Sequence, residues 1–362
     1  MRFLCRLRWR TLIFYLKITM FLFWVSLYIA VLRVIKMAYS PVVKDYPAPD
    51  NYTLLSIPII GEDMGNEEVF DIHSDKNTSL ELEQRVTVAQ NVCQHYSLTS
   101  QSINSKEFYV DHEHHLVWCN IFKAGSSYWL YKFNILAGYD KKFLSKTRQL
   151  PLMLARKKFP RPSEEELKDA IADPGVTSLL IVRDPFVRLL SAFRDKLENN
   201  TRPLYRNLAK RIIKEHRQQA TEIFGPIKSR GPTFYEFVAY LIKKNKEKDY
   251  SFDEHWSPYY QFCSPCAVNF TVIAKVETLA RDSAFLIRDL GLEHVLGKTV
   301  KDRRIRDRIV NKSRDGKNTT TLLKGYFKQL DQDMLSDLLR IYGIDFEMFG
   351  YDTKIYRSYV RD

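Results

Sequence analysis

Two short apolar runs that each enter a helix through a tight turn constrain the fold of this chain more than any other feature. Residues 116–121 and 177–182 are rich in leucine, β-branched and aromatic side chains and carry no charge. Short runs of this kind are typical of buried strands, and strands that are apolar on both sides are typical of a parallel sheet covered on both faces. The sequence therefore predicts an α/β fold in one domain, with a mainly parallel central sheet flanked by helices.

The turn after the first run has the composition of an anion-binding loop. It reads Lys123-Ala124-Gly125-Ser126-Ser127 and leads into an apolar helix over residues 129–136. Small residues let backbone amides approach an anion closely, and the dipole at a helix start favours negative charge. An ordinary ATP or GTP loop is disfavoured, because its lysine follows a glycine whereas Lys123 precedes Gly125. A purely structural strand, turn and helix is the alternative.

The second run ends in a similar junction. Arg183 follows the strand, and Asp184-Pro185 turns the chain into a helix with Ser191 about two turns along. Ligands of open α/β sheets bind beyond the carboxyl ends of the strands. Two such junctions, one with Lys123 and one with Arg183, predict a ligand that bears two separate phosphates. The alternative is that Arg183 and Asp184 form a local ion pair and that Ser191 is an ordinary helix serine.

The N-terminal stretch predicts a membrane anchor. Residues 11–32 are apolar apart from Lys17, which is long enough to span a bilayer if that lysine reaches the headgroups. Four arginines precede the stretch, so the positive-inside rule places the N-terminus in the cytosol. A cleaved signal peptide is the alternative, but no small-x-small pattern follows. The predicted domains are a cytosolic tail (1–10), a signal anchor (11–32), a lumenal stem (33–79) and a catalytic domain (80–362).

The formal net charge of +13 is concentrated near the N-terminus, where the first forty residues hold seven basic residues and no acidic one. The remaining chain is moderately basic, which suits an anionic partner without requiring nucleic acid. Basic groups at residues 156–158, 210–211 and 301–308 could line a groove for a polyanionic glycan, although charge runs are usually solvated faces.

Cysteines and glycosylation sequons agree with a lumenal location. Four cysteines follow the anchor, which fits two disulfides in an oxidising compartment and leaves three pairings open: Cys93, Cys119, Cys263 and Cys266. A zinc site or a redox pair at Cys263 and Cys266 is the alternative, but no second cluster of matching spacing occurs. Six sequons lie on the proposed lumenal side: Asn51, Asn77, Asn199, Asn269, Asn311 and Asn318.

Weaker patterns predict the remaining elements. Capping boxes at Ser163–Glu166 and Thr233–Glu236 each start a helix. The other expected elements are a helix over 80–95, a third buried strand over 268–276, a helix over 278–290, and a closing helix over 333–342 with Gly343 as its cap.

Together these stretches resemble the Golgi carbohydrate sulfotransferases, most closely the chondroitin and dermatan 4-O-sulfotransferase branch. Residues 122–129 are similar to that family's 5′-phosphosulfate loop, usually written Pro-Lys-Val-Ala-Cys-Thr-Asn-Trp, but with Phe122, Ser126 and Tyr128 at the first, fifth and seventh positions. Residues 183–196 resemble its 3′-phosphate motif. Further landmarks fit at 255–256, 263–266, 275–279 and 345–351. The resemblance covers roughly residues 93–351.

This resemblance implies a sulfotransferase fold of the P-loop-NTPase-like kind, with 3′-phosphoadenosine 5′-phosphosulfate (PAPS) as the sulfate donor. The acceptor implied is a glycan hydroxyl, the 4-position of N-acetylgalactosamine in chondroitin or dermatan. The expected donor-binding residues are Phe122, Lys123, Ala124, Gly125, Ser126, Ser127 and Tyr128 for the 5′ end, and Arg183, Asp184, Pro185, Phe186, Val187, Arg188, Leu189, Leu190 and Ser191 for the 3′-phosphate. Arg188 is the weaker of the arginines, because its helical position could equally face solvent.

The expected catalytic residues are Lys123, which would stabilise the leaving phosphate oxygen, and His255, which would act as the base on the acceptor hydroxyl. Glu254 and Glu277 are the alternative bases. A metal site at His112 to His115 is disfavoured, because the donor chemistry requires no metal. The implied location is the Golgi membrane, as a single-pass type II protein with a lumenal catalytic domain, and whether it forms a homodimer stays open.

Two other functions are alternatives. A type II Golgi glycosyltransferase shares the membrane plan but needs an Asp-x-Asp metal motif after a strand, and the tripeptide at 331–333 opens an apparent helix instead. A catalytically inactive glycan-binding relic of the fold is the third, since the first motif is altered.

Overall fold

The computed structural model describes residue 20 and residues 72–99, 102–198, 202–247, 250–297 and 318–362. The chain divides into two compact units, residues 1–55 and 56–362, and every element considered below belongs to the second. The predicted tail, stem and anchor lie almost wholly outside the described residues. Among those that are described, no helix is both long and apolar enough to cross a membrane.

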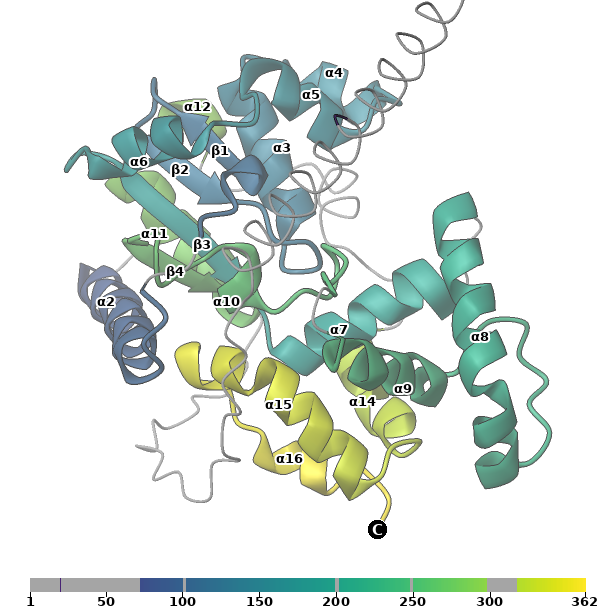
Figure 1. Cartoon of the computed structure of the whole chain (residues 1–362). Helices are drawn as coiled ribbons and strands as arrows, with labels where there is room; N and C mark the ends of the chain where they lie inside the picture. The colour runs from purple at the N-terminus through teal and green to yellow at the C-terminus, as the bar shows by residue number, and fades with distance from the viewer. Residues whose placement is uncertain (1–19, 21–71, 100–101, 199–201, 248–249, 298–317) are drawn as a thin grey trace, which may run out of the picture. The chain divides into compact units, whose positions relative to one another are not determined.

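The core of the second unit is a four-stranded sheet in the order β1-β2-β3-β4 (Figure 1). Its strands are β1 (Phe108–Asp111), β2 (Leu116–Cys119), β3 (Thr177–Val182) and β4 (Val272–Lys275). Strands β2, β3 and β4 are parallel, whereas β1 pairs with β2 as an antiparallel edge strand. The predicted α/β fold with a mainly parallel sheet is therefore confirmed.

Helices cover both faces of this sheet. One face packs against α3 (Ser126–Leu136), α5 (Pro151–Lys158), α11 (Leu279–Asp289) and α12 (Glu293–Leu296). The core on this face contains the rings of Trp118 from β2 and of Trp129 and Phe133 from α3. The other face packs against α2 (Ile72–His95), α6 (Glu164–Ala172), α10 (Tyr259–Phe262) and α15 (Gln332–Met348). Because side chains alternate along a strand, neighbouring residues of β2 point to opposite faces of the sheet. Leu116 and Trp118 pack in the layer that contains α3, and Val117 and Cys119 pack in the layer that contains α2.

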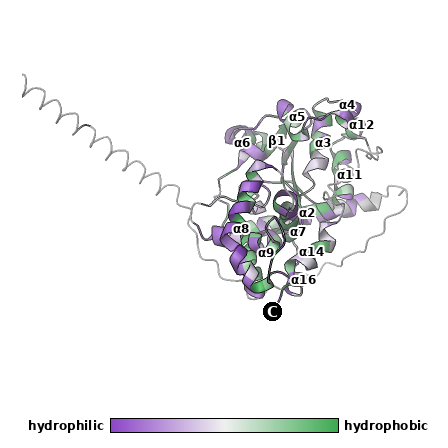
Figure 2. Ribbon diagram, turned by 90° about the vertical axis from the view of Figure 1, so that its right-hand side faces the viewer, coloured by the Kyte–Doolittle hydropathy of each residue, from purple (hydrophilic) through white to green (hydrophobic). Residues whose placement is uncertain are grey.

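A second, helical core lies beyond the carboxyl end of β3. It is built from α7 (Pro185–Phe193), the π-helical turn η2 (Arg194–Glu198), α8 (Pro203–Phe224), α9 (Phe234–Asn245), α14 (Thr319–Phe327), α15 and α16 (Lys354–Arg357). Phe186 of α7 lies at its centre, with four aromatic neighbours within 6.1 Å. Helix α8 mixes hydrophilic and hydrophobic residues along its length, as a surface helix does (Figure 2). The remaining short elements are α4 (Lys141–Lys146), η1 (Ser105–Glu107) and η3 (Val276–Thr278).

Two disulfides attach the segment after α10 to the sheet layer. Cys119 at the end of β2 bonds to Cys263, and Cys93 in α2 bonds to Cys266. The prediction of two disulfides is confirmed. The interpretation of Cys263 and Cys266 as a zinc site or a redox pair is wrong, because each cysteine bonds to a different, distant partner.

Several predicted boundaries shift. The helix expected from residue 80 begins at Ile72, and the strand expected over 268–276 is shorter, with Asn269 exposed in the preceding loop. Gly343 does not cap the helix that was expected over 333–342. This helix, α15, continues to Met348 because Phe346 and Met348 bury their side chains in the core. Both predicted capping boxes are confirmed. Of the sequons, Asn77, Asn269 and Asn318 are exposed, and Asn51, Asn199 and Asn311 lie outside the described residues.

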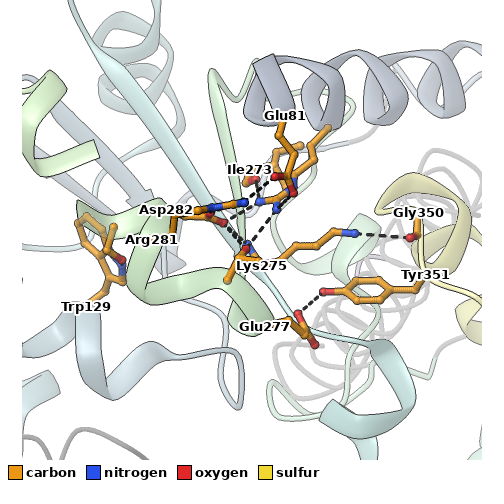
Figure 3. A network of polar contacts seen from close by, with 12 residues as sticks. Glu81, Trp129, Ile273, Lys275, Glu277, Arg281, Asp282, Gly350 and Tyr351 are labelled. Carbon is orange, nitrogen blue, oxygen red and sulfur yellow. Dashed lines mark hydrogen bonds and ion pairs between the residues drawn. The ribbon is translucent and has the colours of Figure 1, made fainter. Parts of the chain in front are cut away.

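A buried polar network fixes α2 and α11 against the end of β4 (Figure 3). The carboxylate of Asp282 in α11 is fully buried and accepts hydrogen bonds from Arg85 Nη1 and from the hydroxyl of Thr278, both at 2.7 Å. The backbone amide of Lys275 also donates to this carboxylate, at 3.2 Å. Arg85 in turn donates to the carbonyl of Ile273 in β4 at 3.2 Å. The network thus sets where α11 begins.

We expect Asp282→Asn to lower the free energy of unfolding by about 3 kcal/mol, because it removes one charge of a buried pair and leaves Arg85 with the partly exposed Glu81 as its anionic partner. Urea unfolding of the purified protein, followed by circular dichroism, measures the change. Asp289→Asn is the matched control, since Asp289 is exposed in the last turn of the same helix and its loss should change the free energy by less than about 0.5 kcal/mol. Equal destabilisation by the two variants would contradict the assignment.

Candidate active site

The loop between β2 and α3 has the backbone of an anion cradle. Lys123 and Gly125 both adopt left-handed conformations, with φ of 67° and 72°, and Gly125 is the N-cap of α3 without any side-chain cap. Gly125 is suited to this position because its positive φ disfavours other residues, and a Cβ would come within 2.8 Å of Leu279 Cδ2 at the start of α11. Alternating left-handed residues before a helix start turn successive amides toward one point, where an anion is stabilised.

The ammonium group of Lys123 is held inside this site. Its Nζ lies 3.3 Å from Asp195 Oδ2, and its side chain is 15% exposed. Burial lowers the pKa of Lys123, and the attraction of Asp195 opposes that shift only in part. Asp195 also contacts Lys196 at 3.2 Å and belongs to the π-helical turn η2, a form of helix often found at functional sites. No role was predicted for Asp195, although it lies within the second motif.

At the second junction, hydrogen bonds fix the backbone of Arg183. The hydroxyl of Tyr259 accepts from the amide of Arg183 at 3.0 Å and donates to its carbonyl at 2.9 Å. Asp184 is the N-cap of α7 and accepts from the amides at 186 and 187, and from the hydroxyl of Tyr356 at 2.6 Å. The carboxylate of Asp184 therefore caps the helix. Among the contacts of the described residues, there is no ion pair between Arg183 and Asp184, which was the alternative.

Arg183 and Ser191 are available for a ligand. Both are partly exposed, and within the described part of the chain neither the guanidinium nor the hydroxyl has a hydrogen-bond partner. A charged donor and a hydroxyl donor left unpaired at the carboxyl edge of a parallel sheet fit an oxyanion. The hydrophobic members of the motif differ, because their side chains are buried in the core and leave only their backbone for a ligand: Pro185, Phe186, Val187, Leu189 and Leu190.

Arg188 does not take the exposed position that its place on a helix left open. It is 1% exposed, so it does not face solvent, and its guanidinium donates to the backbone carbonyls of Phe122, Ser257 and Glu254. Its hydrogen bonds are made within the protein.

His255 is arranged as a general base. Its Nδ1 lies 2.8 Å from Asp253 Oδ1 and 3.0 Å from the hydroxyl of Tyr205. Because a carboxylate only accepts hydrogen bonds, we assign the ring proton to Nδ1, which leaves a lone pair on Nε2. Burial lowers the pKa of His255, and Asp253 raises it by less, so the imidazole is neutral at physiological pH. No described residue is hydrogen-bonded to Nε2. Asp253 and Tyr205 were not predicted as partners.

The imidazole of His255 also packs against the first loop. Its ring centroid lies 4.7 Å from that of Phe122, the residue before Lys123. The proposed base and the proposed leaving-group stabiliser are therefore brought to the same site by elements far apart in the sequence.

The alternative bases have other contacts. Glu277 accepts from the hydroxyl of Tyr351 at 2.8 Å (Figure 3). It also accepts from the amide of Asp184 at 3.3 Å, so it supports the second junction. The side chain of Glu254 is 46% exposed, and its backbone carbonyl accepts from Arg188. Partial burial of its carboxylate, together with nearby carboxylates, raises the pKa of this side chain. Neither has the oriented, unpaired basic atom of His255.

The other candidate clusters do not converge on this site. His114 pairs with Asp111 at 2.8 Å beside the β1–β2 turn, and no group of three metal-ligating side chains forms among the described residues. Asp331 of the Asp-x-Asp tripeptide caps α15 by accepting from the amide of Met334 at 2.9 Å. In the first basic group, Arg156 donates to the carbonyls of Phe108 and Lys106.

A comparison with protein families matches residues 106–352 to the sulfotransferase family. The chain belongs to the sulfotransferase family. Among curated proteins, this sulfotransferase is 27% identical over 257 residues to carbohydrate sulfotransferase 11 of Rattus norvegicus, covering 69% of the chain and 68% of that protein. It is 28% identical over 294 residues to carbohydrate sulfotransferase 10 of Homo sapiens, covering 74% of the chain and 75% of that protein. It is also 28% identical over 284 residues to carbohydrate sulfotransferase 9 of Homo sapiens, covering 77% of the chain and 61% of that protein. No solved structure matches.

Membership agrees with the predicted resemblance, and both predicted motifs lie within the matched residues. The family transfers sulfate from PAPS, and the residues fit such a donor: Gly125 keeps the left-handed backbone of the cradle, and Arg183 and Ser191 have no hydrogen-bond partners among the described residues. The glycosyltransferase alternative is set aside.

Proposed function

We propose that this sulfotransferase passes the sulfuryl group of PAPS to a carbohydrate hydroxyl, namely the 4-hydroxyl of N-acetylgalactosamine in chondroitin or dermatan. The observation that carries the proposal is the contact between Phe122 and His255, which brings a base beside the Lys123 loop. The carbohydrate acceptor is suggested by the names of the relatives, and the 4-position by the resemblance of residues 122–129 and 183–196 to the 4-O branch.

The mechanism is an in-line displacement at sulfur. Nε2 of His255 takes the proton of the acceptor hydroxyl while its oxygen bonds to sulfur, and Asp253 stabilises the imidazolium that forms. The bond between sulfur and the phosphate oxygen of the donor breaks, and Lys123 with the amides of the first loop stabilises the charge that develops on that oxygen. Arg183 and Ser191 hold the 3′-phosphate, which fixes the donor through a part that does not react.

We also propose that the protein is a type II Golgi membrane protein with its catalytic domain in the lumen. Residues 11–32 supply the anchor in this proposal. The two disulfides support it, because such bonds persist in the oxidising secretory compartments. Three exposed sequons are consistent with it: Asn77, Asn269 and Asn318.

The first test is sulfate transfer from radiolabelled PAPS by the purified protein. The acceptors offered are desulfated chondroitin, dermatan and a glycan with terminal N-acetylgalactosamine, and disaccharide analysis reads the modified position. Transfer to the 4-position is the expected result. Transfer elsewhere on the sugar would correct the acceptor assignment, and absence of both transfer and donor binding by calorimetry would overturn the proposal in favour of a glycan-binding relic.

Arg183→Ala is expected to raise KM for PAPS about fiftyfold while kcat falls less than fivefold. The substitution removes a charge-assisted hydrogen bond to a phosphate that remains bound in both the ground state and the transition state. Steady-state kinetics at saturating acceptor separates the two constants. Ser191→Ala should raise KM less, by about tenfold, because a neutral hydroxyl binds phosphate more weakly. An unchanged KM in Arg183→Ala would remove this residue from the donor site.

A further inference from the structure

The side chain of Arg188 lies between the two loops of the active site. Nε donates to the carbonyl of Phe122 at 3.0 Å, in the loop of Lys123. Nη1 donates to the carbonyl of Ser257 at 2.7 Å and Nη2 to that of Glu254 at 3.3 Å, on either side of His255. One buried guanidinium therefore joins two segments that are more than a hundred residues apart in sequence.

The same guanidinium also contacts an aromatic ring of the second segment. It lies over Tyr259, 4.6 Å from the ring centroid, and the hydroxyl of Tyr259 holds the backbone of Arg183. Because the guanidinium is planar, it can present donors in two directions and a flat face to a ring at once. A lysine ammonium at this position could not keep all of these contacts.

We propose that Arg188 is a positioning residue that sets the spacing between Lys123 and His255, and that it does not bind the donor. The proposal rests on the proposed function. An in-line displacement needs the base and the leaving-group stabiliser on opposite sides of sulfur, and a misplacement of about 1 Å costs roughly a hundredfold in rate. Arg188 acts on both groups through backbone carbonyls, so its loss changes the rate of the reacting complex more than donor affinity.

Arg156 provides a matched control. Its guanidinium lies over Tyr109, 3.6 Å from the ring centroid, and donates to the carbonyls of Phe108 and Lys106 at 2.6 and 3.0 Å. It thus makes the same kind of contact at the edge strand β1, and among the described residues it bonds to neither the Lys123 loop nor the segment around His255. A loss of kcat or Tm that both lysine variants share therefore reflects the general cost of replacing a packed arginine.

The experiment compares Arg188→Lys with Arg156→Lys in the full-length protein. It measures Tm, kcat, KM for PAPS, and Kd for 3′-phosphoadenosine 5′-phosphate by calorimetry. We expect Arg188→Lys to lower kcat about a hundredfold with Kd changed less than threefold, and Arg156→Lys to keep kcat within threefold. Equal losses of kcat in the two variants would overturn the proposal. So would a tenfold weaker Kd in Arg188→Lys with unchanged kcat, which would return Arg188 to the donor site.

Chemical rescue gives a second readout. Guanidinium ions, added below the concentration that unfolds the protein, are expected to raise kcat of Arg188→Gly at least tenfold and to leave Arg156→Gly unchanged. Absence of rescue in an Arg188→Gly protein that still binds 3′-phosphoadenosine 5′-phosphate would count against positioning by the guanidinium.

A third measurement stays informative if the wild-type protein transfers no sulfate and the proposed function fails. The imidazole signal of His255, assigned with His255→Asn, is titrated by NMR in the two lysine variants. Its pKa is expected to move toward the ordinary value in Arg188→Lys alone, because the ring loses its buried position. The charged groups that act on this ring are the same in both variants: Asp253, Glu254, Lys196 and Lys123. An unchanged pKa in Arg188→Lys would overturn the proposal independently of activity.

Discussion

Lys123→Met is expected to lower kcat for sulfate transfer about a thousandfold while the protein keeps its fold. The methionine preserves the buried stem of the side chain and removes only its charge. Loss of one donor aimed at developing charge costs about 10²–10³ in rate, and Lys123 acts from a largely buried position where electrostatic interactions are strong. Single-turnover assays with radiolabelled PAPS at saturating acceptor measure the chemical step directly.

The control for this variant is Lys123→Arg, which keeps the charge but changes its shape. It should recover part of the lost rate, since charge contributes more here than the exact position of one donor. Circular dichroism and Tm establish that both variants are folded. If Lys123→Met kept more than a tenth of the wild-type kcat, the leaving oxygen would have to be stabilised by other groups, and the role given to Lys123 would be wrong.

His255→Asn should lower kcat by about 10³-fold and Asp253→Asn by about 10²-fold. The first variant removes the basic atom itself, whereas the second keeps it but loses the partner that fixes the ring tautomer and stabilises the imidazolium. Because Tyr205 still contacts Nδ1 in Asp253→Asn, part of the ring orientation should survive. Equal rates for His255→Asn and the wild type would transfer the role of base to another residue, with Glu254 next to be tested.

The pH profile distinguishes the two groups. His255 must be neutral to accept a proton, so kcat should rise with pH and level off after a pKa below the ordinary 6.5, because burial lowers it. Lys123 must be charged, so kcat should fall again at alkaline pH through a pKa below the ordinary 10.5, which burial also lowers. His255→Asn should abolish the acidic limb alone. A profile that rises only above pH 7 would contradict the buried, neutral imidazole.

Local patterns predicted the elements that carry the proposed donor site. Strand β3 has the predicted bounds, because six uncharged residues, the last four of them apolar, are followed by Arg183-Asp184-Pro185 and leave little choice of boundary. The lysine and glycine of the first loop and both capping boxes also depend on neighbours within a few residues. Such features could be predicted because they depend on residues that are close together in the sequence.

The missed features depend on contacts between distant segments. Strand β1 is four residues long and is stabilised by its antiparallel pairing with β2, and the long surface helix α8 was not predicted at all. Tyr205 meets His255 across 50 residues, and the orientation of Arg188 depends on carbonyls 66 and 69 positions away. Neither spacing nor composition records which distant carbonyl or hydroxyl a side chain will meet.

Both disulfides join an early cysteine to a late one. Cys93 and Cys119 are translated 173 and 144 residues before Cys266 and Cys263, respectively. The only other cysteine before residue 263 is Cys5, which the proposed topology places in the cytosol. In the lumen, Cys93 and Cys119 therefore have only each other to oxidise with until nearly three quarters of the chain has emerged. A newly made chain is accordingly exposed to a wrong Cys93–Cys119 bond, and its maturation yield should depend on thiol exchange by an isomerase rather than on how fast the helices and sheet assemble.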